Sequence, residues 1–134
     1  MVIRIGLDRG TDNKVIAYAL DYPGCFATGI DDAEAILKLP QALLKYEIWI
    51  KDHTDNCWVN FTEMDLRVTD VMDSYIIDGG SNPDLAGIEV NAFFEDDLKP
   101  VTEIEAERAL LVFTWQREEL LGGISTLSQE ILIK

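Results

Sequence analysis

The chain has 134 residues, with 11 basic and 25 acidic side chains, and its formal net charge is −14 at pH 7. This length suits one ordinary domain and excludes two full enzyme domains, while 48% hydrophobic residues make disorder of the whole chain a poor explanation. The acidity disfavours direct binding to nucleic acids or anionic membranes, which attract cationic side chains. It favours a basic protein partner, although an acidic surface also serves solubility alone.

The first 29 residues predict a β-hairpin followed by a short third strand. Residues 2–7 alternate well enough for a strand, and residues 14–20 resume the strand pattern after a run of turn-forming residues. Pro23 fixes its own φ and Gly24 tolerates positive φ, so the chain can turn sharply into a strand over residues 25–28.

The next segment predicts a helix that ends at about residue 52. Asp31 is a suitable N-cap, and Glu34, three residues later, completes the pattern of a capping box. The apolar residues that follow at helical spacing are Ile36, Leu39, Leu43, Tyr46 and Ile50. Pro40 lies inside this helix and predicts a kink, because it cannot donate the usual backbone hydrogen bond.

Strand-like alternation returns from residue 57 to about residue 77 and again over residues 87–94, with a loop at residues 78–84. The fold class that we predict is therefore α+β: an antiparallel hairpin with a third strand, one helix and further strands. We expect residues 1–97 to form this domain and residues 98–134 to form a helical extension.

The extension predicts a long helix from Thr102 to about residue 121. Thr102 and Glu105 form a second capping box, and Gly122 and Gly123 are expected to loosen or end the helix. Ser128 would then cap a short terminal piece. The apolar side chains cover too much of the circumference for a helix with one buried face, so we expect oligomerisation, with a dimer favoured. The residues expected to mediate it are Leu110, Leu111, Phe113, Trp115, Leu120 and Leu121.

No residue pattern predicts a catalytic, cofactor-binding or metal site. His53 is the only histidine and is interpreted as a solvated residue at a helix C-terminus, while Cys25 is interpreted as a small buried hydrophobic residue. One enzymatic alternative stays open. Asp8, Asp12 and Asp21 could cluster at the end of the hairpin and support Mg²⁺-dependent, nuclease-like chemistry.

The sequence also indicates a compartment. The first residues lack the pattern of a signal peptide, and no apolar run approaches the roughly 20 residues that span a bilayer. We therefore expect a cytoplasmic protein without membrane contact. Cys25 and Cys57 are expected to be free thiols in a reducing compartment.

Residues 14–50 contain the runs IAYALDYPGCFATG and DDAEAILKLPQALLKYEIWI. Their order, a strand, a Pro-Gly-Cys corner, a strand closed by glycine and an acid-capped helix, resembles the HicB-like domain. The likeness covers about residues 1–52, and the later strands would complete the domain by about residue 95. Its motif residues are Tyr18, Pro23, Gly24, Cys25 and Gly29.

The HicB resemblance implies a non-enzymatic, protein-binding fold in which Pro23, Gly24 and Gly29 are architectural. In that family the domain is an antitoxin that blocks a small basic RNA-cleaving toxin, usually with an appended DNA-binding segment. No helix-turn-helix or ribbon-helix-helix pattern follows here. The alternative is an orphan HicB-like domain with a structural role, or one that senses a small ligand, and without a toxin partner.

The tail carries a second resemblance. Residues 107–132, ERALLVFTWQREELLGGISTLSQEIL, look like the first helix of a DinB-like four-helix bundle, a family that commonly holds a metal on three histidines. His53 lies outside this segment, so no metal ligand carries over and no cofactor is expected. We interpret the segment as an oligomerisation helix.

Overall fold

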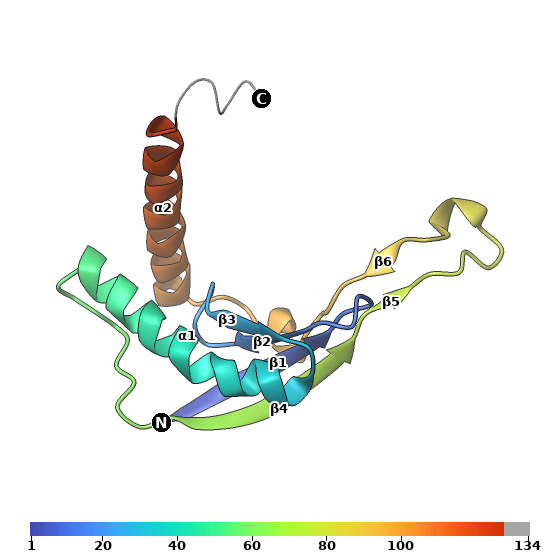
Figure 1. Cartoon of the computed structure of the whole chain (residues 1–134), viewed down its shortest axis with the longest axis horizontal. Coiled ribbons are helices and arrows are strands. Elements are labelled where there is room, and N and C mark those ends of the chain that lie inside the picture. The colour runs from blue at the N-terminus through green and yellow to red at the C-terminus, as the bar shows by residue number, and fades with distance from the viewer. Residues whose placement is uncertain (128–134) are drawn as a thin grey trace. The chain divides into compact units, whose positions relative to one another are not determined.

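The computed structural model of the chain describes residues 1–127 (Figure 1). It divides into two compact units, the N-terminal unit Met1–Lys99 and the C-terminal unit Pro100–Lys134. The described residues form six strands in two sheets, two α-helices and two short 3₁₀ turns. The predicted α+β class is confirmed.

The N-terminal unit is built on a four-stranded sheet in the order β3-β2-β1-β4. The predicted hairpin and third strand are present as β1 (Val2–Arg9), β2 (Val15–Ala19) and β3 (Phe26–Gly29), which pair antiparallel. Strand β4 (Asp65–Asp73) lies parallel to β1. A parallel neighbour requires a crossover connection, and α1 (Asp32–His53) supplies it.

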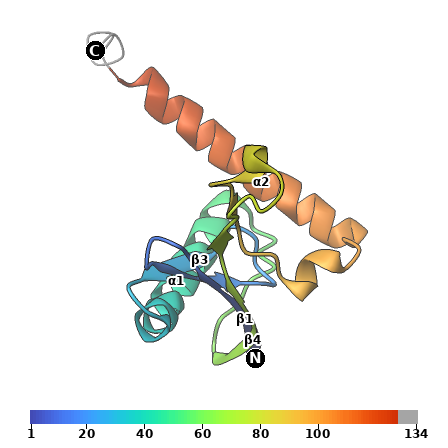
Figure 2. The same ribbon diagram turned by 90° about the vertical axis from the view of Figure 1, so that its right-hand side faces the viewer.

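The core of the N-terminal unit lies between this sheet and α1, which contacts β2 and β3 (Figures 1 and 2). Side chains alternate between the two faces of a strand, so every second residue of β1 and β2 belongs to the same face. Ile3, Ile5 and Leu7 of β1 are buried, as are Val15, Ala17 and Ala19 of β2. The buried apolar residues of α1 are Ala35, Leu39, Leu43, Tyr46 and Ile50.

Helix α1 begins where the capping residues predict. The Asp31 carboxylate accepts a hydrogen bond of 2.8 Å from the backbone N–H of Glu34. The return bond differs from a standard capping box, because the Glu34 carboxylate accepts from the N–H of Ile30 (3.3 Å), one residue before the cap. Pro40 lies inside the helix, which continues through it for a total of 22 residues; the kink stays a prediction.

The strand predicted over residues 87–94 is much shorter in the structure. Instead of one strand over residues 87–94, only β6 (Glu89–Val90) pairs, with β5 (Tyr75–Ile76) as its partner, and a 3₁₀ turn follows at Glu95–Leu98. Alternation alone does not make a strand, because each residue also needs a neighbouring backbone to pair with. Residues 75–90 therefore form a narrow arm, yellow to green in Figure 1, with a 3₁₀ turn at Pro83–Leu85.

The C-terminal unit contains α2 (Glu103–Ser125). Its start is confirmed: the N–H of Thr102 donates to the Glu105 carboxylate (2.8 Å), and the N–H of Glu105 donates to Thr102 Oγ1 (3.2 Å). The predicted end is wrong. The helix continues through Gly122 and Gly123, since glycine lowers helix stability by only about 1 kcal/mol and does not block the backbone bonds. The predicted cap Ser128 lies outside the described residues.

Neither α-helix of the described residues is sufficiently long and apolar to cross a membrane.

Candidate interaction surfaces

The Pro-Gly corner is a tight β-turn that ends with Cys25. The N–H of Cys25 donates to the carbonyl of Tyr22 (3.0 Å), and Gly24 has a φ of +85°. Proline at the second position and a positive φ at the third are the requirements of a type II turn. Cys25 is 4% exposed, and burial raises the pKa of its thiol to about 11. A buried protonated thiol fits the interpretation of Cys25 as a small hydrophobic residue.

Gly29 lies where β3 meets the start of α1. A Cβ at this position would stand 2.5 Å from the backbone nitrogen of Ala35 and 2.8 Å from Cβ of Glu34. Any larger residue would push the strand away from the helix. The glycine is therefore compatible with this close approach because it lacks a side chain.

The sheet face opposite α1 carries an aromatic cluster of Tyr18, Phe26 and Phe94. The ring centroid of Tyr18 lies 6.0 Å from that of Phe26 and 5.9 Å from that of Phe94. Phe94 covers Gly6 of β1, where an added Cβ would stand 2.9 Å from the Phe94 ring. Phe26, on edge strand β3, is 51% exposed. This side of the sheet thus presents an aromatic surface that is only partly covered.

The three aspartates proposed to cluster at the end of the hairpin are not brought together, so that expectation is wrong. Asp8 accepts a hydrogen bond from Ser74 Oγ (3.0 Å), and Asp12 accepts one from the backbone N–H of Lys14 (3.1 Å). Asp21 lies at the opposite end of the hairpin, where it pairs with Arg4. Among residues 1–127, no group of three or more His, Cys, Asp or Glu side chains is placed to hold a metal ion.

His53 is half-buried rather than solvated. Its Nδ1 lies 2.7 Å from the carbonyl oxygen of Trp49, and the two rings are 4.5 Å apart at their centroids. The sequence placed His53 correctly in the last turn of α1. It missed the contact with Trp49, although a spacing of four residues puts two side chains on the same side of a helix.

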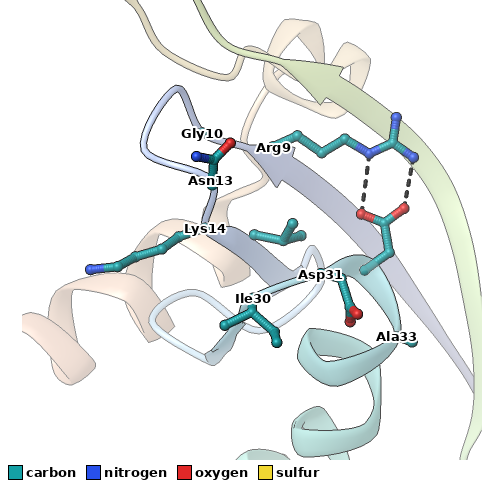
Figure 3. Close-up of a pocket in the computed structure, with 9 residues that line it drawn as sticks. Arg9, Gly10, Asn13, Lys14, Ile30, Asp31 and Ala33 are labelled. Atoms are coloured by element: carbon teal, nitrogen blue, oxygen red, sulfur yellow. Dashed lines mark hydrogen bonds and ion pairs between the residues drawn. The ribbon is translucent and has the colours of Figure 1, made fainter.

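An open depression of about 570 Å³ lies between the β1–β2 turn and the start of α1 (Figure 3). Its cation Arg9 is paired with the Asp32 carboxylate through two hydrogen bonds, of 3.1 and 2.7 Å. The Lys14 side chain extends away from this pair, and Asp31 on the other wall already caps α1. Three of the four charged side chains of the lining, Arg9, Asp31 and Asp32, therefore already have hydrogen-bond partners.

A second apolar stripe lies on the outer side of α1 and was not predicted. Leu37, Leu44 and Ile48 are 79%, 45% and 61% exposed, and they follow one another at helical spacing. The apolar spacing in the sequence predicted only the buried face of this helix. The outer stripe could have been predicted from the sequence, because Leu44 follows Leu37 by seven residues and Ile48 follows Leu44 by four, which places all three on one side of a helix.

The six residues assigned to oligomerisation are mostly exposed. Leu110, Phe113 and Leu120 are 65%, 63% and 64% exposed, Leu111 and Leu121 are also exposed, and Trp115 is half-buried. Within the described part of the C-terminal unit, α2 is the single regular element. Its apolar surface is therefore much larger than one isolated helix can bury by itself.

No protein-family model, curated protein or solved structure matches this chain.

Proposed function

We propose that the chain is a non-enzymatic protein-binding module that works as a homo-oligomer and, as its HicB-like motif implies, neutralises a small basic RNA-cleaving protein. The observation that carries the proposal is the number of large apolar side chains left exposed on α1 and α2 of a chain with a net charge of −14. Exposed apolar surfaces of this kind are typical of protein interaction sites.

The open sheet face is the better candidate for a basic partner. Tyr18 and Phe26 supply an aromatic centre, and Asp8 and Asp70 lie on the same face through the strand register. Aromatic residues are enriched at the centres of interfaces, and carboxylates at the rim attract a cationic partner and speed its association. The stripe on α1 is less suitable for this partner, because Lys38 and Lys45 flank it in sequence.

The two activities are assigned to different units. The N-terminal unit would hold the basic protein, while α2 would join copies of the chain. Helix α2 offers apolar side chains along its whole length, whereas its charged residues are mainly acidic and two arginines are the exceptions. A homo-oligomer of this design would present two or more acidic binding faces to its partners, which raises avidity without a new contact.

The proposal requires a short basic protein encoded beside this chain, and the test uses that protein. The two purified proteins are mixed, the mass of the complex is measured by light scattering, and RNA cleavage is followed with and without the acidic chain. Complex formation and loss of cleavage are expected. Phe26→Asp should weaken both, whereas the matched control Leu37→Asp, on the outer side of α1, should weaken neither.

If the basic protein neither binds nor loses its activity, the antitoxin role is wrong. A homo-oligomer without such a partner would then support the alternative role as an orphan structural domain.

A further inference from the structure

One face of α2 carries a seven-residue repeat. Steps of four and three residues alternate along it, which is the spacing of the a and d positions of a coiled coil. We name these residues the α2 seam: Ala106, Leu110, Phe113, Arg117, Leu120 and Ile124.

All six residues of the seam are exposed. Its four large apolar residues, Leu110, Phe113, Leu120 and Ile124, are between 43% and 65% exposed. At 100° per residue, Leu111 and Trp115 project from the opposite side of the helix. The six residues first assigned to oligomerisation therefore do not all lie on one side of α2. The seam keeps Leu110, Phe113 and Leu120 and adds Ala106, Arg117 and Ile124.

Resting on the homo-oligomer proposed above, we propose that the α2 seam pairs antiparallel with the α2 seam of a second copy. The seam residues lie symmetrically on either side of residue 115. A two-fold axis at that level therefore makes every contact between the two helices occur twice, once in each direction. In this register Leu110 faces Leu120 of the partner subunit. Ala106 faces Ile124 of the partner subunit, and Phe113 faces Arg117 of the partner subunit.

Charge selects the antiparallel orientation. A parallel pair in register would place each Arg117 against Arg117 of the partner subunit at the centre of the contact. Like charges placed together are unfavourable. In the antiparallel pair Arg117 instead lies over the aromatic ring of the partner's Phe113, which is a favourable cation–π arrangement.

The helix ends also avoid like-charge contact in this orientation. The first turns of α2 contain Glu103, Glu105 and Glu107, whereas residues 120–125 carry no charge. The antiparallel register places the acidic end of one helix beside the uncharged end of the other. Antiparallel helices also bring opposite ends of their dipoles together. A second copy of this chain in the antiparallel orientation therefore fits the apolar pattern of the seam and keeps the acidic ends of the two helices apart.

Cysteine cross-linking tests the register in the full chain. In a Cys57→Ser background, which removes the less buried native thiol, Leu110→Cys and Leu120→Cys are made separately, and one of them carries a size tag. The two are refolded together and oxidised. Antiparallel pairing predicts a mixed disulfide and almost none between identical variants, since identical positions would be roughly 15 Å apart along the axis.

The outcomes separate this inference from the proposed function. Disulfides within each single variant would show a parallel pair and overturn the register while leaving a homo-oligomer. An oligomer without any cross-link would overturn the seam itself. A monomeric unmodified chain in light scattering would overturn the homo-oligomer and this inference together.

A matched pair of neighbouring residues gives an independent test. Leu110→Asp, on the seam, should weaken self-association at least tenfold in sedimentation, whereas Leu111→Asp, on the other side, should leave it within a factor of two or so. Phe113→Leu keeps an apolar layer but removes the aromatic ring, and should weaken association about threefold to thirtyfold. Equal loss in Leu110→Asp and Leu111→Asp, with helicity retained in both, would contradict the proposal.

Discussion

The carboxylate of Glu47 accepts a hydrogen bond of 3.0 Å from the backbone N–H of Phe61. Glu47 is the one buried charged residue of the described chain, at 8% exposed, and its other oxygen pairs with Lys51 one turn later. The bond fastens α1 to the irregular segment that leads into β4. Phe61 is itself buried, and its ring centroid lies 4.9 Å from that of Tyr22 beside the Pro-Gly corner. Glu47 thus holds in place the connection that allows β4 to run parallel to β1.

Replacing Glu47 should therefore destabilise the N-terminal unit. Glu47→Ala leaves the buried N–H of Phe61 without an acceptor, at a cost of about 1–3 kcal/mol. Glu47→Gln keeps a neutral acceptor at the same place and should cost less. Urea unfolding of both variants at pH 7 measures the difference. Equal losses in the two variants would show that the Phe61 bond is not the source of the effect.

The same residue predicts a pH dependence. The pairing with Lys51 lowers the pKa of Glu47, and the Phe61 N–H lowers it further. A carboxylate with a lowered folded pKa contributes stability that is complete above its unfolded pKa of about 4.3 and is lost as the pH falls through the folded value. The free energy of unfolding is therefore expected to differ between wild type and Glu47→Gln at pH 7 and to converge below about pH 4. A constant difference across this range would contradict the assignment.

Local signals in the sequence predicted the helix starts and the corner. Thr102 and Glu105 bond reciprocally, and Pro23 with Gly24 forms the expected tight turn. Each depends on residues within four positions of one another, so a short run of sequence contains the whole cause. The hairpin was predictable for the same reason.

Pairings between distant residues were not predictable in this way. The residues in and around β4 do not predict that this strand pairs parallel to β1, or that the register shifts beside Gly6. Asp21 was grouped with Asp8 and Asp12 by residue type, yet Arg4 holds it at the other end of the hairpin, and Arg4 also reaches Asp96. Arg4 and Asp96 are 92 positions apart in the sequence, so their pairing depends on the tertiary structure and cannot be predicted from local sequence.

Gly29→Ala is expected to destabilise the N-terminal unit. The new methyl would meet the backbone nitrogen of Ala35 at 2.5 Å, and backbone atoms cannot move aside as the end of a flexible side chain can. Overpacking of this kind costs about 1–3 kcal/mol. Thermal unfolding followed by circular dichroism measures the loss. Unchanged stability would show that β3 and α1 separate easily at this point.

Gly122→Ala should have the opposite sign. Gly122 lies within α2, and a Cβ built there has no atom within 4 Å beyond its own helix backbone. Replacing an unhindered helical glycine by alanine stabilises a helix by about 0.5–1 kcal/mol, because the unfolded chain loses less freedom on folding. Far-ultraviolet circular dichroism should report higher helicity and a higher melting temperature. A decrease would indicate that α2 does not continue through this glycine in solution.

Cys25 should resist alkylation in the folded chain. Its side chain is buried behind the turn, and its thiol pKa of about 11 leaves almost no thiolate at pH 8, which is the reactive form. Two single-cysteine variants separate the thiols: Cys57→Ser retains Cys25, and Cys25→Ala retains the half-buried Cys57. Iodoacetamide labelling followed by mass spectrometry should modify Cys57 at least tenfold faster, and urea should abolish the difference by unfolding the turn. Fast labelling of Cys25 without urea would mean that the corner opens readily, and the type II turn would then be a marginal rather than a rigid element of the fold.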